Sequence, residues 1–334
     1  MRVLEYPVFC VPDPTPWPPF TMTGHSHRHA FRHAALLYAG DDEYADALVP
    51  FIRGGLEAEE PVLVMVPPPK LDLLHVALGN DAREVHFADM AEVGSNPARI
   101  IPAWGEFVAE RGSGGRRARG IGEPIWSGRT RAEVVECQHH EALLNVAFDG
   151  AAMDLLCPYD EHALDGDVLE DACRSHPIKL ERGSFLDSST YAGTDTLAKP
   201  LAQPLSEPQR RTHELDFDMS TLEGLRIFVA VHAAAAGLAE ERCEDLVLAL
   251  NELATNSIRH GGGSGSLRMW VEDESVVAEV RDRGRIDRPL AGREAPRSDQ
   301  IGGHGLWLVN QLCDLLQMRT FADGSVVRVH MRRA

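Results

Sequence analysis

The stretch Glu252-Leu-Ala-Thr-Asn256-Ser-Ile-Arg-His260-Gly261 decides the fold of the C-terminal part of the chain. It ends a helical pattern that starts at Glu240 and has an apolar stripe of Leu246, Leu250, Leu253 and Ser257. Glu252, Asn256 and His260 recur every four residues, so they share a second face of the helix. A carboxylate and a carboxamide stacked in this way can face one pocket, or they can form an ordinary solvated surface.

Two glycine motifs follow this helix. Asp282-Arg-Gly284 comes directly after an alternating strand, and a glycine there permits a tight turn against a flat ligand. Gly302-Gly-His-Gly305 leads straight into an apolar helix that begins at Leu306. Glycines before a helix N-terminus free backbone N–H groups for an anion, which the helix dipole also favours. A glycine-rich loop alone is more often a flexible turn, but three motifs in this order predict a phosphate-binding site.

These three motifs resemble the N box and the two glycine boxes of the GHKL ATPase superfamily. Within that superfamily, the region from about His213 to the C-terminus resembles the RsbW-like anti-sigma-factor serine kinases. The resemblance implies an α+β sandwich of the Bergerat type, with ATP and Mg²⁺ as cofactors. It also implies a protein serine/threonine kinase as the activity.

The resemblance implies a role for each motif residue. Asn256 would be a ligand of the Mg²⁺ that bridges the ATP phosphates, and Glu252 would be the catalytic general base for a substrate hydroxyl. Asp282 would accept a hydrogen bond from the adenine amino group, with Gly284 packed beneath the ring. The other cofactor-binding residues would be His260, Gly302, Gly303, Gly305 and Leu306. His260 either touches phosphate or only complements the negative end of the helix dipole.

Two positions depart from the family pattern. Arg285 stands where many relatives carry another glycine, and residues 285–301 form a charged, proline-containing lid candidate. Gly324-Ser-Val326 stands where a Gly-Thr-Thr run is frequent, which weakens the expected hydrogen bonding on the adenine side. ATP binding tolerates both departures better than phosphoryl transfer does.

Composition restricts the partners. The 334 residues include 33 basic and 51 acidic side chains, so the formal net charge is −18. Such a charge argues against nucleic acid and anionic membrane surfaces as partners. The six cysteines form no C-x-x-C pair, so the sequence indicates neither a zinc site nor a disulfide scaffold. No apolar run is long enough to span a bilayer. These features predict a cytoplasmic protein.

Strand and helix patterns divide the chain into two domains. In the N-terminal part, short apolar runs alternate with helical segments, which predicts an α/β fold with a mostly parallel sheet. In the C-terminal part, strands and helices come in runs, which predicts an α+β sandwich with helices on one face. The predicted divisions are a proline-rich tail at 1–24, a sensory domain at 25–186, a linker at 187–213 and an ATPase domain at 214–334.

The N-terminal domain resembles the MEDS sensory-domain family. The resemblance rests on Gly122-Glu-Pro-Ile-Trp126, on His139-His-Glu-Ala-Leu-Leu-Asn145 and on the order of strands and helices from His33 to about Arg182. It implies a RecA/KaiC-type fold that has lost its phosphate loop, and the chain indeed carries no G-x-x-x-x-G-K-[ST] motif. The family implies a sensor whose signal the sequence does not name.

Histidines suggest two specific functions for this domain, metal binding and phosphate acceptance. His25, His27, His29 and His33 are candidate metal ligands, but their spacing matches no structural zinc pattern and no nearby carboxylate or thiolate accompanies them. His140 followed by Glu141 is reminiscent of a phosphoacceptor histidine. The flanking sequence predicts one helix of an α/β domain instead of a two-helix dimerisation hairpin, so a histidine packed between helix and sheet is the favoured interpretation.

The leading function predicted from the sequence is an anti-sigma regulatory protein in signal transduction and transcription regulation. It would sequester a sigma factor and phosphorylate a STAS-type anti-sigma factor antagonist under control of the sensory domain, and it could act as a homodimer. Two alternatives remain open. One is an ATP-binding module that sequesters its partner without transferring phosphate, and the other is an atypical histidine kinase.

Overall fold

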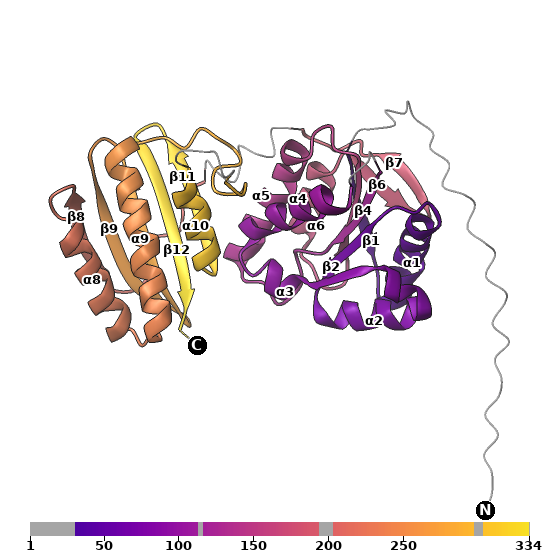
Figure 1. Cartoon of the computed structure of the whole chain (residues 1–334), viewed down its shortest axis with the longest axis horizontal. Helices are drawn as coiled ribbons and strands as arrows, with labels where there is room; N and C mark the ends of the chain where they lie inside the picture. Colours follow the sequence, from indigo (N-terminus) through magenta and orange to yellow (C-terminus); the bar gives the residue numbers. More distant parts are fainter. Residues whose placement is uncertain (1–30, 113–115, 194–202, 297–302, 334) are drawn as a thin grey trace, which may run out of the picture.

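The computed structural model describes residues 31–112, 116–193, 203–296 and 303–333. Figure 1 shows two domains side by side, the first built on a mostly parallel sheet and the second on an antiparallel sheet. The predicted tail at 1–24 lies outside the described residues, as do residues 194–202 of the predicted linker and Gly302 of the predicted site. Within the described ranges, no helix combines the length and apolar character needed to cross a membrane.

A seven-stranded sheet organises the N-terminal domain. In spatial order its strands are β3 (His86–Asp89), β2 (Val62–Val66), β4 (Ala118–Gly122), β5 (Met153–Asp160), β1 (Arg32–Tyr38), β6 (Ile178–Glu181) and β7 (Ser184–Asp187). All neighbouring pairs are parallel except β6 with β7. Every residue of β2 is buried, which is typical of a parallel strand that helices cover on both faces.

Helices pack on both faces of this sheet and create two cores. Side chains of β1 alternate between them, with Ala34 and Leu36 in one core and Ala35 in the other. The helices are α1 (Asp41–Glu57), α2 (Pro68–Leu78), α3 (Met90–Val93), α4 (Ile100–Arg111), α5 (Arg131–Ala147) and α6 (Gly166–Ser175), with 3₁₀ turns η1 (Gly79–Glu84) and η2 (Pro97–Arg99). Helix α5 begins with a capping box between Thr130 and Glu133, which fixes its first turn.

A five-stranded antiparallel sheet organises the C-terminal domain. Its spatial order is β11 (Leu315–Phe321), β12 (Gly324–Arg332), β10 (Ser275–Asp282), β9 (Ser264–Glu272) and β8 (His213–Asp218). Three helices cover one face (Figure 1): α8 (Leu222–Ala235), α9 (Glu240–His260) and α10 (His304–Leu312). Leu246, Leu250 and Leu253 of α9 enter the core between helices and sheet, as the apolar stripe predicts.

The opposite face of this sheet carries a cluster of paired charges. Glu279 is fully buried and accepts hydrogen bonds from Arg268, Arg281 and Arg328. Glu207, in the segment before β8, pairs with Arg268 and Arg281. These ion pairs close the polar face of the sheet, while the hydrophobic core lies on the side of the helices.

Two expectations about single elements are wrong, and one hairpin is not expected. The apolar pattern of residues 305–316 predicts one helix over that range, but α10 ends at Leu312, because Cys313 adopts extended backbone angles and Leu315 already pairs with β12. The sequence patterns do not predict the antiparallel β6–β7 hairpin. The residue types of Asp41 and Asp42 predict that one of them caps the helix after Gly40. In the structure Gly40 is the N-cap of α1, and both aspartates lie in its first turn.

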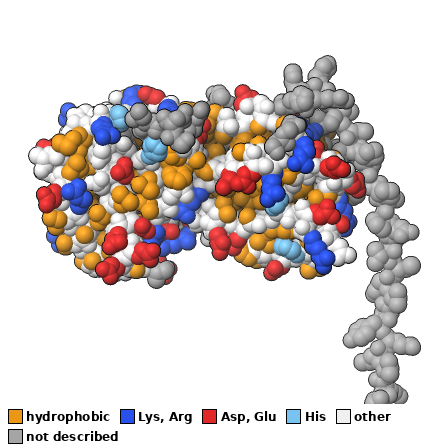
Figure 2. Space-filling model, in the orientation of Figure 1, with side chains coloured by type: hydrophobic (Ala, Val, Ile, Leu, Met, Phe, Trp, Pro, Cys, Tyr) orange, Lys and Arg blue, Asp and Glu red, His pale blue; other side chains and the backbone are white. Residues whose placement is uncertain are grey.

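The surface mixes both signs of charge. Figure 2 shows acidic and basic side chains interspersed on the visible face of both domains, with hydrophobic side chains over the helical face of the C-terminal domain. The largest exposed hydrophobic side chains there are Met219, Ile227, Val231 and Leu248, which belong to α8, α9 or the turn before α8.

Candidate functional site

A cavity of about 500 Å³ lies in the C-terminal domain between α9, the end of β10, residues 284–296 and the start of α10. It brings together residues from all three predicted motifs. Of the predicted site residues, those on its wall are Asn256, His260, Asp282, Gly284, Gly303, Gly305 and Leu306. Gly302 belongs to the residues that the structure leaves undescribed.

Glu252 is absent from the cavity wall but lies directly behind it. A Cβ atom on Gly305 would come within 2.9 Å of Oε2 of Glu252 and 3.1 Å of Nδ2 of Asn256. Glycine at this position therefore lets the start of α10 approach both polar side chains. Among the described residues, neither Glu252 nor Asn256 has a side-chain hydrogen bond or ion pair, so both are available to a ligand.

Three protein donors hold Asp282 in one orientation. Ser257 donates to its Oδ2 at 2.6 Å, while the backbone N–H of Gly284 and the hydroxyl of Ser325 donate to its Oδ1 at 2.7 and 2.9 Å. A carboxylate offers about four acceptor sites, so one more donor can bind. An amino group of a ligand in the cavity matches that remaining capacity.

Close backbone contacts fix the turn that follows Asp282. A Cβ atom on Gly284 would lie 2.8 Å from the carbonyl oxygen of His260 and 3.0 Å from Cα of Gly261. A Cβ atom on Gly261 would lie 2.4 Å from Cγ of Asp282. The end of α9 and the end of β10 therefore touch through glycines, which leaves a flat backbone surface at the cavity.

The N-terminus of α10 is a potential anion site. Gly303 is the N-cap in the left-handed conformation with φ of 83°, and no side chain caps the first turn. The first N–H groups of this nine-residue helix thus remain for a ligand, and the helix dipole makes this end positive. Arg285 and Arg288 also line the cavity and add positive charge.

The N-terminal domain contacts the other end of α10. Arg99 donates to the carbonyl oxygens of Asn310, Gln311 and Cys313 at 2.7–2.8 Å. Asn96, which is fully buried, donates to the carbonyl oxygen of Asn310 at 3.1 Å. A cation at a helix C-terminus satisfies the last carbonyl groups and complements the dipole.

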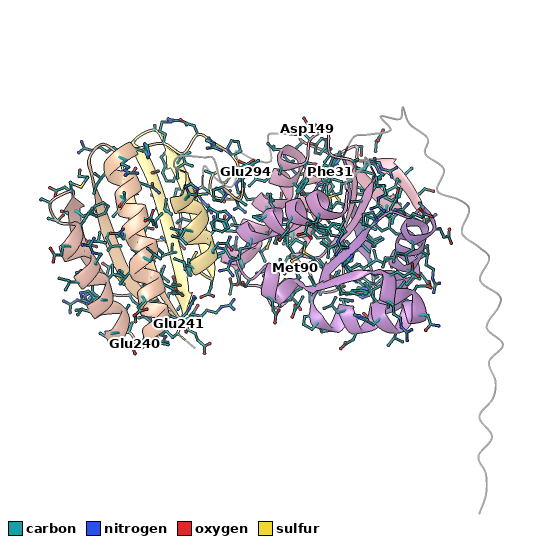
Figure 3. The ribbon with its side chains drawn as sticks, viewed as in Figure 1. Phe31, Met90, Asp149, Glu240, Glu241 and Glu294 are labelled. Carbon is teal, nitrogen blue, oxygen red and sulfur yellow. The ribbon has the colours of Figure 1, made fainter. Side chains whose placement is uncertain are left out.

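A buried ion pair connects the two domains next to the cavity. Glu136 of α5 lies 2.9 Å from Nη2 of Arg319 and 3.8 Å from Nη2 of Arg293, and all three side chains are at most 3% exposed. Burial lowers the pKa of Arg293, although Glu136 opposes that shift. Figure 3 labels Glu294, the residue after Arg293, where this segment passes between the domains. Contacts with the N-terminal domain thus hold the segment that lines the cavity.

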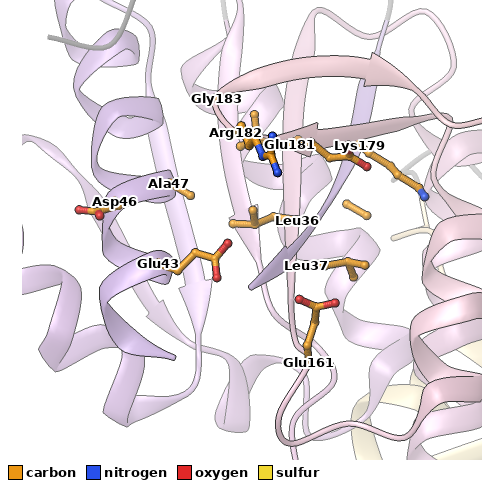
Figure 4. A pocket seen from close by; sticks show the side chains of 12 residues that line it. Leu36, Leu37, Glu43, Asp46, Ala47, Glu161, Lys179, Glu181, Arg182 and Gly183 are labelled. Carbon is orange, nitrogen blue, oxygen red and sulfur yellow. The ribbon is translucent and has the colours of Figure 1, made fainter. Parts of the chain in front are cut away.

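A second cavity, of about 600 Å³, lies in the N-terminal domain between α1, β1 and the β6–β7 hairpin. Figure 4 shows Glu43 of α1 and Glu161, which follows β5, extending their carboxylates into it. Lys179 and Arg182 supply positive charge on the hairpin side. This cavity has the mixed charge of a small polar ligand site, without a glycine loop at a helix N-terminus.

His139 and His140 are buried in α5, with 3% and 1% exposure. Burial lowers the pKa of His140 to about 3. The helix lies in an α/β domain and packs on its sheet, as the sequence predicts. A buried imidazole cannot meet the phosphate of a nucleotide, so the geometry gives no support to a phosphoacceptor at this position.

Sequence reasoning misses the roles of three residues of the site. Ser257 belongs to the apolar stripe of α9 by its spacing, yet its hydroxyl binds Asp282. Ser325 stands where the sequence predicts weaker hydrogen bonding on the adenine side, and its hydroxyl also binds Asp282. Arg293 falls in the predicted charged lid and is instead buried. The role of Ser257 could be predicted from its position as a polar residue within an apolar stripe. No feature of the sequence predicts that Arg293 is buried.

Two family models match the chain. Residues 32–177 match the MEDS model, described as methanogen/methylotroph, DcmR sensory domain, and residues 216–331 match the histidine kinase-like ATPase domain. No curated protein matches.

Solved structures show weaker similarity. The RsbU and RsbW domains of Rv1364c from Mycobacterium tuberculosis match at 18% identity and a TM-score of 0.29, over 37% of this chain and 32% of that chain. The Acinetobacter baumannii histidine kinase AdeS matches at 15% identity and a TM-score of 0.23, over 37% of this chain and 70% of that chain. This chain thus spans about a third of the first structure's length.

Proposed function

We propose that this chain, which joins a MEDS domain to a GHKL-like, histidine kinase-like ATPase domain, is an ATP- and Mg²⁺-dependent protein serine kinase under sensory control. Its proposed partners are a sigma factor, which it sequesters, and a STAS-type antagonist, which it phosphorylates. One observation carries the proposal: a single cavity joins Asn256, the Asp282–Gly284 turn and the glycine-capped start of α10.

The residues at hand fit ATP and Mg²⁺. The amide oxygen of Asn256 is a hard ligand of the kind Mg²⁺ prefers. Asp282 would accept from the adenine amino group, and the N–H groups after Gly303 would bind phosphate. When bound, Mg²⁺ would neutralise phosphate charge as the γ-phosphoryl group leaves. Glu252, near Gly305 and Asn256, would take the proton from the substrate hydroxyl.

The domain contacts suggest how the sensor would act. Helix α10 would present its N-terminus to phosphate, and Arg99 binds the carbonyls at its C-terminus. Glu136 faces Arg293, which follows the lining residue Gly292. A change in the MEDS domain that moved α5 or η2 would therefore alter the nucleotide cavity from two directions.

A second candidate function is partner sequestration without phosphoryl transfer. The observation that favours it is the position of Glu252, which stands behind the described cavity wall instead of on it. Exposed Ile227 and Val231 on α8 would suit such a module, because apolar side chains gathered on a surface favour protein contacts.

The test measures nucleotide binding and transfer separately. Full-length chain is titrated with ATP and Mg²⁺ by calorimetry, and then incubated with γ-labelled ATP and the proteins that co-purify with it. We expect acid-stable label on a serine or threonine of a partner. Glu252→Gln should keep ATP binding within a few fold and reduce transfer by about a hundredfold or more, as removal of a general base does.

Matched variants distinguish the candidates. Asp282→Asn should lose ATP binding, whereas Glu274→Gln, a change in the turn between β9 and β10, should bind normally. Normal transfer by Glu252→Gln contradicts the base assignment. Binding without any labelled product selects the sequestering module. Acid-labile label that disappears in His140→Gln selects a histidine kinase.

A further inference from the structure

Four potential metal ligands meet inside the N-terminal domain, far from the nucleotide cavity in sequence. They are His33 of β1, Glu141 of α5, Cys157 of β5 and His176, which follows α6. Their ligand atoms all lie within 4.8 Å of one another, and each residue is at most 1% exposed. Oε2 of Glu141 lies 3.1 Å from Nε2 of His33 and 3.2 Å from Nε2 of His176.

Neighbouring groups fix the tautomer of His33. Nδ2 of Asn145 donates to the carbonyl oxygen of Ser175 at 2.8 Å, so Oδ1 of Asn145 is the atom that faces the imidazole. Nδ1 of His33 lies 3.1 Å from that oxygen and must carry a hydrogen. In the neutral ring, Nε2 of His33 therefore presents a lone pair to Glu141 and to Sγ of Cys157, which is 3.3 Å away.

The same argument applies to His176. Its Nδ1 lies 2.7 Å from the carbonyl oxygen of Ala172, which can only accept, so Nδ1 carries the hydrogen. Nε2 of His176 then also presents a lone pair to the Glu141 carboxylate. Fixing a histidine tautomer through its outer nitrogen is the usual second-shell arrangement of metal-binding histidines.

The lone pairs leave the cluster short of positive charge. A carboxylate faces two imidazole nitrogens, and lone pairs at 3.1–3.2 Å repel unless a proton or a metal ion lies between them. Nε2 of His176, Oε1 of Glu141 and the nearby hydroxyl of Tyr159 are buried without a hydrogen-bond partner in the described part of the chain.

We propose that His33, Glu141, Cys157 and His176 bind one divalent transition-metal ion, with Zn²⁺ the best fit. Two neutral imidazoles, a carboxylate and a thiolate carry a charge of −2, which one divalent ion neutralises. Zinc accepts nitrogen, oxygen and sulfur ligands at roughly 2.0–2.3 Å, so tetrahedral ligand atoms lie roughly 3.3–3.7 Å apart. The three shortest distances between ligand atoms of the cluster, 3.1–3.3 Å, are close to these ligand–ligand distances.

The surrounding fold suits a slowly exchanging ion. β1 and β5 are neighbours in the sheet, with Ala35 opposite Cys157, so His33 and Cys157 come from adjacent strands. Both ligand-bearing strands lie in the interior of the sheet, and α5 covers the cluster. The ion would enter during folding and resist chelators in the native state. This site does not depend on the proposed kinase activity.

The experiment uses the full chain, unfolded in chelator and refolded without metal. Titration with Co²⁺ should show one equivalent of tight binding, with a thiolate-to-cobalt charge-transfer band and the intense visible bands of tetrahedral Co²⁺. Zn²⁺ should displace the Co²⁺ and raise the Tm of the chain. Cys157→Ser should lose the charge-transfer band, and His176→Gln should bind at least tenfold more weakly. Cys137→Ala, which changes another buried thiol on α5, should keep both signals.

Two further measurements make the result decisive. A variant with His25→Gln, His27→Gln and His29→Gln must still bind one equivalent of Co²⁺. Loss of this binding would assign the metal to the N-terminal segment instead. X-ray absorption of zinc-loaded wild-type chain needs no variant to fold. One sulfur and three nitrogen or oxygen ligands support the site; a shell without sulfur, or no stoichiometric metal at all, overturns it.

Discussion

Glu136→Gln is the sharpest test of how the two domains are held together. Its carboxylate lies between the guanidinium groups of Arg319, at 2.9 Å, and Arg293, at 3.8 Å. Glutamine keeps the size of the side chain but removes its charge, so two buried cations remain without an anion. The variant isolates charge from packing.

The expected cost follows from burial. Removing one partner of a buried ion pair typically destabilises by about 3–5 kcal/mol, because the other charge is left uncompensated. A loss of about 3 kcal/mol corresponds to more than a hundredfold in the ratio of docked to separated domains. Asp81→Asn is the control, since the side chains of Asp81 and its partner Arg53 are 44% and 48% exposed. There we expect a loss of less than about 1 kcal/mol.

Docking can be measured by small-angle scattering and by hydrogen exchange of α10, with unfolding free energies from urea titrations. Glu136→Gln should enlarge the radius of gyration and speed exchange at the C-terminal end of α10. Adding Arg293→Met should restore part of the loss, because it removes one of the two uncompensated cations. Equal effects of Glu136→Gln and Asp81→Asn, or no recovery in the double variant, would refute the reasoning.

Three other predictions concern single residues. Burial raises the pKa of Glu123, which accepts hydrogen bonds from Tyr38 and Tyr44, to about 7. The folded chain therefore binds a proton more tightly than the unfolded chain, so stability should fall by up to about 3 kcal/mol as pH rises from about 4.5 to 7, and urea titrations of Glu123→Gln should lack that slope. Gly284→Ala should abolish ATP binding in calorimetry because its Cβ meets backbone atoms, whereas Gly224→Ala on α8, where nothing lies within 4 Å, should bind normally and gain up to about 1 kcal/mol of stability. Ser257→Ala should weaken ATP binding about tenfold, the value of one lost hydrogen bond to a carboxylate, and an unchanged Kd would show that Asp282 needs no such support.

Elements whose pattern is long or repeated are predictable from the sequence. The period of α9 predicts both its ends and its buried stripe, and the alternation of β10 predicts the strand that delivers Asp282. The β6–β7 hairpin escapes prediction because each strand has only four residues and its turn is Arg182-Gly183. Both residues have positive φ, of 47° and 76°, which Asn-Gly would signal more clearly than Arg-Gly.

The site is predictable only where neighbours in space are also neighbours in sequence. The spacing of Glu252 and Asn256 on one helix is enough to indicate a shared pocket. The cluster around Glu141 gives no such sign, because the sheet brings His33, Cys157 and His176 together across more than a hundred residues. Proximity along the chain groups His33 with His25, His27 and His29 instead, and these three lie outside the described residues.

Under the proposed function, helix α10 would couple the nucleotide site to the N-terminal domain, and such coupling is reciprocal. It is nine residues long, about 14 Å, and therefore too short to absorb a displacement by bending. If a signal in the MEDS domain loosens the grip of Arg99 and thereby changes the affinity for ATP, then ATP must change the affinity for that signal by the same factor. Measuring the effect of ATP on the affinity of the N-terminal domain for its signal would then give the same coupling free energy.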